Sequence, residues 1–238
     1  MRTFCHWNLA SLLLLASTVS AFAPGASRAF VSKTSTTELE ATSGALGVRP
    51  IGIGSAAPDR RITNVDLEAV VETNDEWIQT RTGIGSRHVL TDGESLRTLG
   101  AKAAANALEM SGLSADDIDL VIVATSSAED MFGDAPSIAK AIGCGKDTLA
   151  FDLTAACSGF LFSTVTAGKF LSGKGFKNAI VVGADALSRW VDWDDRNTCI
   201  LFGDGAGAMV LTADDKNPGL LGYAMHSNGE GYEDLKLW

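Results

Sequence analysis

Short continuous apolar runs alternate with helix-patterned segments along most of this chain. Residues 120–124 read L-V-I-V-A, and an unbroken apolar run of strand length is typical of a strand buried on both faces. The segment 95–111 has apolar residues at helical spacing and is followed by Gly112, which predicts a helix with a glycine C-cap. Because such a strand needs helices on both sides, the alternation predicts an α/β layered fold.

The same patterns predict the remaining elements of this fold. Further strands are expected at 48–54, 148–153 and 179–182, and further helices at 65–71, 75–80, 136–142 and 158–171. The last helix is apolar nearly all round, so it is expected to be buried on every side. An antiparallel pair is expected over 199–202 and 206–211 around a tight turn at 203–205, with one more strand over 220–226.

Composition excludes several classes of protein. The 238 residues are 46% hydrophobic, which suits one large folded domain or two small ones. A net charge of −10 argues against a general nucleic-acid binder. The four cysteines show neither C-x-x-C spacing nor a histidine at ligand spacing, so no disulfide framework and no metal site is expected.

The first 44 residues differ from the rest of the chain. Residues 1–30 contain no acid, and a short apolar core at 9–15 precedes small residues, which predicts a cleavable signal peptide over about residues 1–21. A hydroxyl-rich, transit-like segment follows. The junction S-A-F-A-P at 20–24 resembles the bipartite plastid-targeting leaders of algae with secondary plastids. That resemblance implies the plastid stroma as destination, and no membrane segment is expected in the mature protein.

Two glycine-rich segments resemble nucleotide-binding patterns without their context. Residues 52–57 match G-x-G-x-x-A, but Pro58 interrupts where a helix would have to begin. Residues 203–207 read G-D-G-A-G and lack the Lys-Ser/Thr of a phosphate loop. The first is therefore rejected as a dinucleotide site, and the second is interpreted as a tight turn.

Cys157 is the candidate nucleophile. It stands between the strand expected at 148–153 and the helix expected at 158–171. A cysteine in an apolar run is usually a small buried hydrophobe, but helix N-terminal amides favour the thiolate, and small neighbours leave room for a substrate carbonyl. This is the nucleophile-elbow arrangement with sulfur in place of oxygen. The other cysteines lack this setting and are expected to be structural or part of the leader: Cys144, Cys199 and Cys5.

Four further segments carry a resemblance to a known family. They read D-E-W-I-Q-T-R-T-G-I at 75–84, S-S-A-E-D-M-F-G at 126–133, V-V-G-A-D at 181–185 and F-G-D-G-A-G-A at 202–208. With the cysteine turn, they closely resemble β-ketoacyl-acyl-carrier-protein synthase III, the condensing enzyme that starts type II fatty acid synthesis. The segment 126–133 is most similar to plastid and cyanobacterial members.

The resemblance runs from about residue 46 to the end of the chain. It implies a thiolase-like layered fold whose first half is complete over 45–215 and whose second half is truncated, beginning at 216–238. It implies that Cys157 takes the acetyl group of acetyl-CoA, and that decarboxylating malonyl-acyl-carrier protein then attacks it to give acetoacetyl-acyl-carrier protein. Acyl-carrier protein and a second copy of the chain are the implied partners, and no cofactor is implied.

The resemblance also implies the binding residues. Trp77 and Arg196 would flank the adenine of CoA, Arg81 would contact its phosphates and Thr73 would lie near the adenine. Phe132 would form a wall of the acyl pocket, where its bulk limits primer length. Without the resemblance, ordinary packing of Trp77 and a local ion pair of Arg196 would be the preferred interpretations.

The chain departs from the family at the decarboxylation step. That step needs a His and an Asn that stabilise the developing enolate oxygen, and the family carries them in motifs resembling H-Q-A-N and G-N-T. Neither motif occurs here, and the histidines, in other contexts, are His6, His88 and His226. We therefore expect an incomplete sequence that is inactive in condensation by itself and exposes the apolar face that the second half would cover.

Two alternatives stay open. One is a non-catalytic fragment or partner subunit that pairs with a complete synthase, and the other is a related polyketide-type thiolase-fold synthase. A transcript that continues beyond Trp238 into the two missing motifs would favour the incomplete enzyme, whereas a verified stop codon there would favour the fragment.

Overall fold

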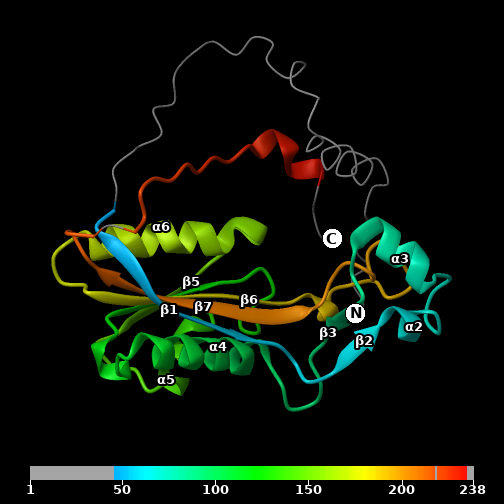
Figure 1. The fold of residues 1–238 in the computed structure, drawn as a ribbon, viewed down its shortest axis with the longest axis horizontal. Helices are drawn as coiled ribbons and strands as arrows, with labels where there is room; N and C mark the ends of the chain where they lie inside the picture. Colours follow the sequence, from blue (N-terminus) through cyan, green and yellow to red (C-terminus); the bar gives the residue numbers. More distant parts are fainter. Residues whose placement is uncertain (1–45, 218, 235–238) are drawn as a thin grey trace, which may run out of the picture. The chain divides into compact units, whose positions relative to one another are not determined.

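The structure is a computed structural model that describes residues 46–217 and 219–234 (Figure 1). These residues belong to two compact units, of which the larger reaches to Tyr223. The described part of the smaller unit, 224–234, contains one 3-10 helix, η5 (Gly229–Asp234). The leader predicted over residues 1–44 lies outside the described residues, and it stays a prediction, as does the boundary at residue 215.

A five-stranded sheet forms the centre of the larger unit, in the order β1-β7-β6-β4-β5. Its central strand β4 is parallel to both neighbours, whereas β7 is antiparallel to β6 and to β1. The carboxyl ends of the three parallel strands therefore lie at one edge of the sheet. The strands span β1 Val48–Ala56, β4 Leu120–Ala124, β5 Leu149–Leu153, β6 Asn178–Ala186 and β7 Asp204–Ala213.

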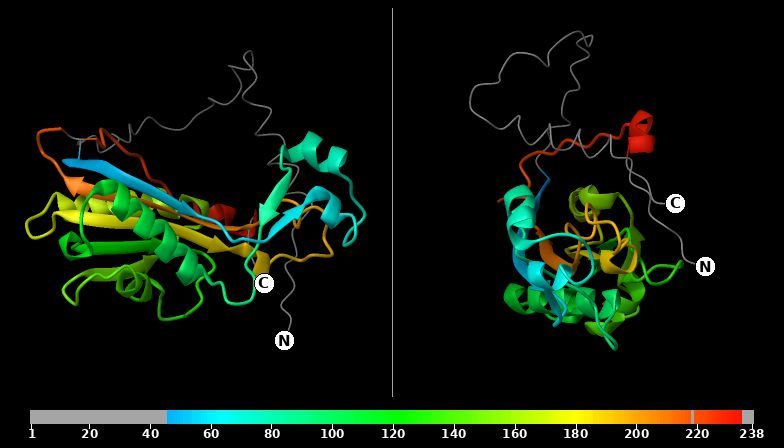
Figure 2. Two further views of the ribbon diagram at one scale, coloured as in Figure 1. Left: turned by 60° about the horizontal axis from the view of Figure 1, so that its bottom comes forward. Right: turned by 90° about the vertical axis from the view of Figure 1, so that its right-hand side faces the viewer.

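Helices cover both faces of this sheet, as the end-on view in Figure 2 shows. The helices α4 (Leu96–Ser111) and α5 (Ala135–Ala141) lie on one face, and α6 (Gly159–Leu171) lies on the other (Figure 1). Side chains of β4 alternate between the two core clusters, with Val121 facing the first and Ile122 the second. The predicted α/β layered fold is confirmed.

A smaller sheet with two short helices lies at one end of the larger unit (Figure 1). Its strands pair in antiparallel register, and sequence patterns did not predict them because each is only three residues long. The helices carry their own polar N-caps, Thr63 for α2 and Asn74 for α3. The elements are β2 Arg61–Thr63, α2 Asn64–Leu67, α3 Asp75–Thr82 and β3 Ser86–His88.

The glycines of the G-x-G pattern serve packing. An added Cβ at Gly52 would collide with the carbonyl of Ala107 on α4, and one at Gly54 would collide with that of Ala103. The strand β1 continues to Ala56, and no helix begins after it. The rejection of a dinucleotide site is therefore supported by the close approach of α4 to this strand.

Three expectations for the second part of the sheet are wrong. Residues 199–201 form turns, in which the amides of Cys199 and Leu201 donate to the carbonyls of Asp195 and Thr198, and residue 202 is irregular. Residues 203–207 are not a tight turn between strands, because β7 begins at Asp204 and takes both its partners from distant segments. No strand spans 220–226, where Leu220 forms only an isolated bridge to Leu46.

Two helices also differ from the prediction. The helix α2 ends at Leu67 instead of residue 71. The helix α6 is not buried on every side, because only its sheet face is packed within this unit, and Leu161 is 66% exposed. Within the described residues, no helix is both long enough and apolar enough to cross a membrane.

Candidate active site

Cys157 lies where β5 turns into α6. It is the middle residue of a one-turn 3-10 helix, η3 (Ala156–Ser158), which α6 follows directly. Ala156 has a φ of 45° and is the one non-glycine residue with positive φ among those described. A left-handed alanine costs on the order of 1–2 kcal/mol, and such strain is typical of functional turns. The strain lies next to the predicted nucleophile.

The three described cysteines are all free thiols, but their surroundings differ. Cys199 is buried, and burial raises the pKa of its thiol. Burial likewise raises the pKa of the half-buried Cys144. Cys157 is exposed, beside the start of α6, whose first amides receive no side-chain cap. Among the described cysteines, Cys157 alone combines access with the electropositive end of a helix.

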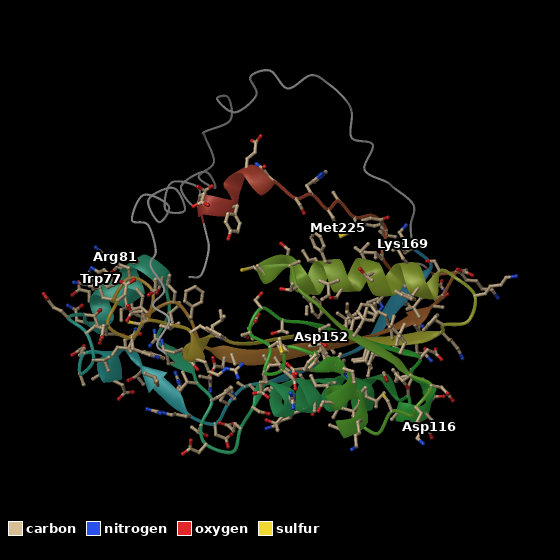
Figure 3. All side chains as sticks on the ribbon, turned by 180° about the vertical axis from the view of Figure 1, so that it is seen from behind. Trp77, Arg81, Asp116, Asp152, Lys169 and Met225 are labelled. Carbon is tan, nitrogen blue, oxygen red and sulfur yellow. The ribbon has the colours of Figure 1, made fainter. Side chains whose placement is uncertain are left out.

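A cluster of cations surrounds the tryptophan of α3. The guanidinium carbon of Arg81 lies 4.3 Å from the ring centroid of Trp77, and that of Arg196 lies 4.1 Å from it. Figure 3 shows Trp77 and Arg81 together at one end of the molecule, away from Asp152. The structure thus brings Arg196, from a distant part of the sequence, against Trp77, which shares α3 with Arg81. Within the described residues, no carboxylate is within ion-pair distance of Arg196, so the interpretation of a local ion pair is wrong.

Two residues that were predicted to lie at the adenine of CoA each carry a polar atom without a partner in the described part of the chain. Nε of Arg196 and Oγ1 of Thr73, just before α3, are buried without a hydrogen bond among the described residues. Buried polar groups are normally satisfied by protein, water or ligand. Both residues were predicted to contact the adenine of CoA, and a ligand at this end of the molecule would have donors and acceptors left to engage.

Arg87 is a buried arginine that the sequence analysis missed. Its Nη2 donates to Oδ1 of Asn64 at 3.0 Å and to the carbonyl of Ile200 at 2.9 Å, and Nη1 donates to the carbonyl of Ile62 at 3.3 Å. Burial lowers the pKa of Arg87. The side chain therefore ties the small sheet, beside α3, to the turn that follows Arg196. No motif marks it, because its partners are neutral and distant in sequence.

The turn 126–134 carries Phe132 after the end of β4. Phe132 and its neighbour Met131 are 89% and 90% exposed. The backbone beneath them is held firmly, since Oδ1 of Asp185 on β6 accepts from the Ser126 amide and from the Ser127 hydroxyl, both at 2.9 Å. The predicted pocket wall, Phe132, is thus an exposed apolar side chain on an anchored backbone.

Asp152 holds the other end of this turn and was also missed. Its Oδ2 accepts from the amides of Asp134 at 2.8 Å and Ala135 at 3.0 Å. These amides begin α5, a helix that has no side-chain cap of its own. No sequence pattern indicates this contact, because the donor and acceptor come from different elements.

The residues described include no cluster of His, Cys, Asp or Glu that could hold a metal ion.

Comparison with known proteins agrees with this geometry. The family model described as 3-Oxoacyl-[acyl-carrier-protein (ACP)] synthase III matches residues 151–229. The chain is 52% identical over 191 residues to the chloroplastic β-ketoacyl-[acyl-carrier-protein] synthase III B of Cuphea wrightii, covering 80% of this chain and 48% of that protein. It is 54% identical over 192 residues to the synthase III of Synechococcus sp. (strain RCC307), covering 80% and 57%.

A solved structure shows the same fold. The 3-oxoacyl-[acyl-carrier-protein] synthase III from Aquifex aeolicus VF5 superposes with a TM-score of 0.68 at 42% identity, over 71% of this chain and 55% of that one. The layered sheet and the cysteine turn between β5 and α6 place the chain in the thiolase-like fold class. Within that class, the chain belongs to the β-ketoacyl-acyl-carrier-protein synthase III family. It spans about half the length of the curated relatives that it matches.

Proposed function

We propose that the protein is the initiating condensing enzyme of type II fatty acid synthesis, an acyltransferase. The reaction converts acetyl-CoA and malonyl-acyl-carrier protein to acetoacetyl-acyl-carrier protein, CO2 and CoA. The observation that carries the proposal is the exposed thiol of Cys157 on a strained turn at the start of α6. Family membership supplies the substrates, since the relatives are named as synthases of this type.

The first half-reaction uses the residues described here. The Cys157 thiolate attacks the carbonyl carbon of the acetyl thioester, the carbonyl π electrons move to oxygen, and their return expels the CoA thiolate, which takes up a proton. The products are acetyl-Cys157 and CoA. The electropositive start of α6, which has no side-chain cap among the described residues, favours the attacking thiolate. Splitting the transfer through a covalent intermediate gives ping-pong kinetics.

The cation cluster around Trp77 is the proposed binding site for CoA. We propose that the adenine enters between the indole ring and the Arg196 guanidinium, while Arg81 contacts the phosphates. Flat rings and guanidinium planes stack well, and a guanidinium fork suits phosphate oxygens. The two unpartnered atoms on Thr73 and Arg196 support this assignment, because a bound ligand would satisfy them.

Phe132 is the proposed wall of the acyl pocket, and a homodimer is the proposed assembly. The exposure of Phe132 and Met131 in a single chain supports a further surface that covers them. The edge strand β5 also exposes Leu149 and is open to pairing. Acyl-carrier protein is the proposed macromolecular substrate.

The second half-reaction rests on the family alone. The motifs that resemble H-Q-A-N and G-N-T do not occur in this sequence, and the chain spans about half of its relatives. These residues therefore support acylation of Cys157, and we expect them not to condense malonyl-acyl-carrier protein by themselves. The plastid stroma is the proposed location, supported by the transit-like leader and by the chloroplastic relative.

Mass spectrometry of the acylated thiol tests the proposal. Incubation of the complete protein with labelled acetyl-CoA should add one acetyl group to the peptide that contains Cys157. The variant Cys157→Ser should take up no thioester label, whereas the matched variant Cys199→Ser, at a buried thiol, should still be acylated. Thioester label that persists in Cys157→Ser, or that appears on Cys144, would overturn the assignment.

A further inference from the structure

A single carboxylate ties the Phe132 turn to the strand that leads into Cys157. Asp152 lies on β5, and its Oδ2 accepts from the amides of Asp134 and Ala135 at 2.8 and 3.0 Å. A charged acceptor for two backbone amides is a strong contact. The predicted pocket wall and the predicted nucleophile are therefore linked through one side chain.

The backbone at Gly133 leaves no space between the turn and this carboxylate. Gly133 follows Phe132 directly, has a φ of 96°, and would place an added Cβ in collision with Oδ2 of Asp152. The main chain thus passes against the carboxylate at the residue next to the pocket wall. The Asp134 amide that Asp152 holds is two peptide units from Phe132.

The turn is clamped from its other side as well. Asp134 is fully buried, and its carboxylate accepts from Nε of Arg97 at 2.6 Å and from the Glu129 amide at 2.8 Å. The hydrogen bond to Asp134 raises the pKa of Arg97, which therefore stays charged. Since Phe132 is 89% exposed, its position within this chain depends on these backbone anchors and not on packing of its ring against other described residues.

We propose that Asp152 is a positioning residue that sets the length of acyl primer the enzyme accepts. It acts through Phe132, and the inference rests on the proposed function. With the Asp152 anchor intact, Phe132 stays where only a short acyl group fits. Without it, the turn relaxes and longer primers gain access to the thiol. In a hydrophobic pocket, one methylene changes the rate by roughly 10- to 200-fold, so a small movement of the wall is measurable.

The chain offers a matched control at the opposite edge of the sheet. Oδ2 of Asp119, just before β4, accepts from the amides of Lys177 and Asn178 at 2.7 and 2.9 Å. This is the same arrangement of one carboxylate oxygen and two successive amides. It lies at the amino ends of the parallel strands, whereas Cys157 follows the carboxyl end of β5. Loss of either carboxylate should lower the stability by a similar amount, but only loss of Asp152 should change which acyl primers are accepted.

The test measures the rate of Cys157 acylation from acetyl-, butyryl- and hexanoyl-CoA on the complete protein. Asp152→Ala should raise the ratio of hexanoyl to acetyl transfer by about tenfold, the low end of a one-methylene effect. Asp152→Asn keeps one oxygen and should show a smaller increase. Asp119→Ala should leave the ratio at the wild-type value.

A double variant shows whether Asp152 acts through the wall. Phe132→Ala should raise the same ratio, and Asp152→Ala added to Phe132→Ala should raise it no further, because coupled residues are not additive. Fully additive effects would overturn the proposal. So would a ratio that is unchanged in both Asp152 variants, or one that changes equally in Asp119→Ala.

Hydrogen exchange separates this inference from the proposed function. Asp152→Ala should increase amide exchange in the peptide spanning 129–137, and Asp119→Ala should not. If wild-type protein takes no acyl group from any CoA thioester, the proposed function fails, while exchange still reports whether Asp152 anchors the turn. If acylation occurs and exchange at 129–137 is unchanged in Asp152→Ala, the positioning role is wrong.

Discussion

The cation cluster at Trp77 and the anchored turn at Phe132 are built in opposite ways. Around Trp77, charged side chains lie against an aromatic ring, and buried polar atoms on Thr73 and Arg196 lack partners. At the turn, apolar side chains are exposed, while Asp152 and Asp134 engage the amides beneath them. At Trp77 the polar atoms that could bind a ligand are free, whereas at the turn Oδ2 of Asp152 and Oδ2 of Asp134 are occupied by backbone amides, although Oδ1 of Asp152 also lacks a partner among the described residues.

This difference matches two tasks in the proposed acyl transfer. A site that binds a large charged carrier gains affinity from donors and planes that the protein leaves unsatisfied. A site that selects a short acyl chain needs a rigid wall, because a displacement the size of one methylene group is enough to change which chain length fits. Binding strength should therefore respond to changes at Trp77, and chain-length selectivity to changes at the turn.

The largest effect is expected from a methyl group at Gly133. Gly133→Ala combines a φ of 96° with a collision against the Asp152 carboxylate, and should lower the free energy of unfolding by about 3 kcal/mol or more. Gly93 is a matched control, since its φ is 90° and nothing lies within 4 Å of an added Cβ. Gly93→Ala should cost only about 1–2 kcal/mol. Urea unfolding measures both, and equal costs would show that the turn is not tightly packed on Asp152.

The second prediction concerns the cation cluster. Arg196→Ala removes one face of the Trp77 stack and should raise the KM for acetyl-CoA about tenfold, within the range of a desolvated cation–π contact. The rise should be the same for hexanoyl-CoA, because both thioesters carry the same adenine, and kcat should change little. The control Arg49→Ala removes an exposed arginine that pairs with Asp214. Steady-state kinetics would contradict the comparison if Arg196→Ala changed the primer ratio instead.

The features that depend on a local pattern or a short motif were predicted from the sequence. It indicated the buried strand 120–124, the helix with Ser95 and Gly112 at its ends, and the thiol turn at Cys157. It also named Trp77 and Arg196, which the structure brings within stacking distance. These features depend on short segments whose apolar period or residue types are visible without the fold.

The parts that sequence reasoning missed depend on contacts between distant segments. Arg87 binds carbonyls and an amide from three separate elements, and Asp152 caps a helix that precedes it. The strand expected at 199–202 failed because β7 pairs with β1 and β6 and needs no adjacent hairpin partner. Neither propensity nor spacing encodes such pairings.

The N-caps of α2 and α5 also differ in whether the contact is local or comes from a distant segment. Changing the local cap gives the smallest effect that we predict. The cap of α2 is local, since the hydroxyl and amide of Thr63 donate to Asp66 at 2.7 and 2.8 Å. The cap of α5 comes from Asp152 on another strand. We expect the local cap to contribute to stability alone, whereas the distant cap is proposed to position the Phe132 turn as well.

The hydrogen bonds from Thr63 hold the pKa of Asp66 below its ordinary value. A carboxylate with a lowered folded-state pKa stabilises the protein above its unfolded pKa of about 4, and this contribution is lost as pH falls through the folded-state pKa. Asp66→Asn should therefore lower the Tm slightly at pH 6 and by less at pH 3, as thermal unfolding followed by circular dichroism can measure. Asp66→Asn should leave the ratio of hexanoyl to acetyl transfer unchanged, unlike the Asp152 variants. A changed ratio would mean that any weakened helix cap alters primer choice, and the distinction between the two caps would fail.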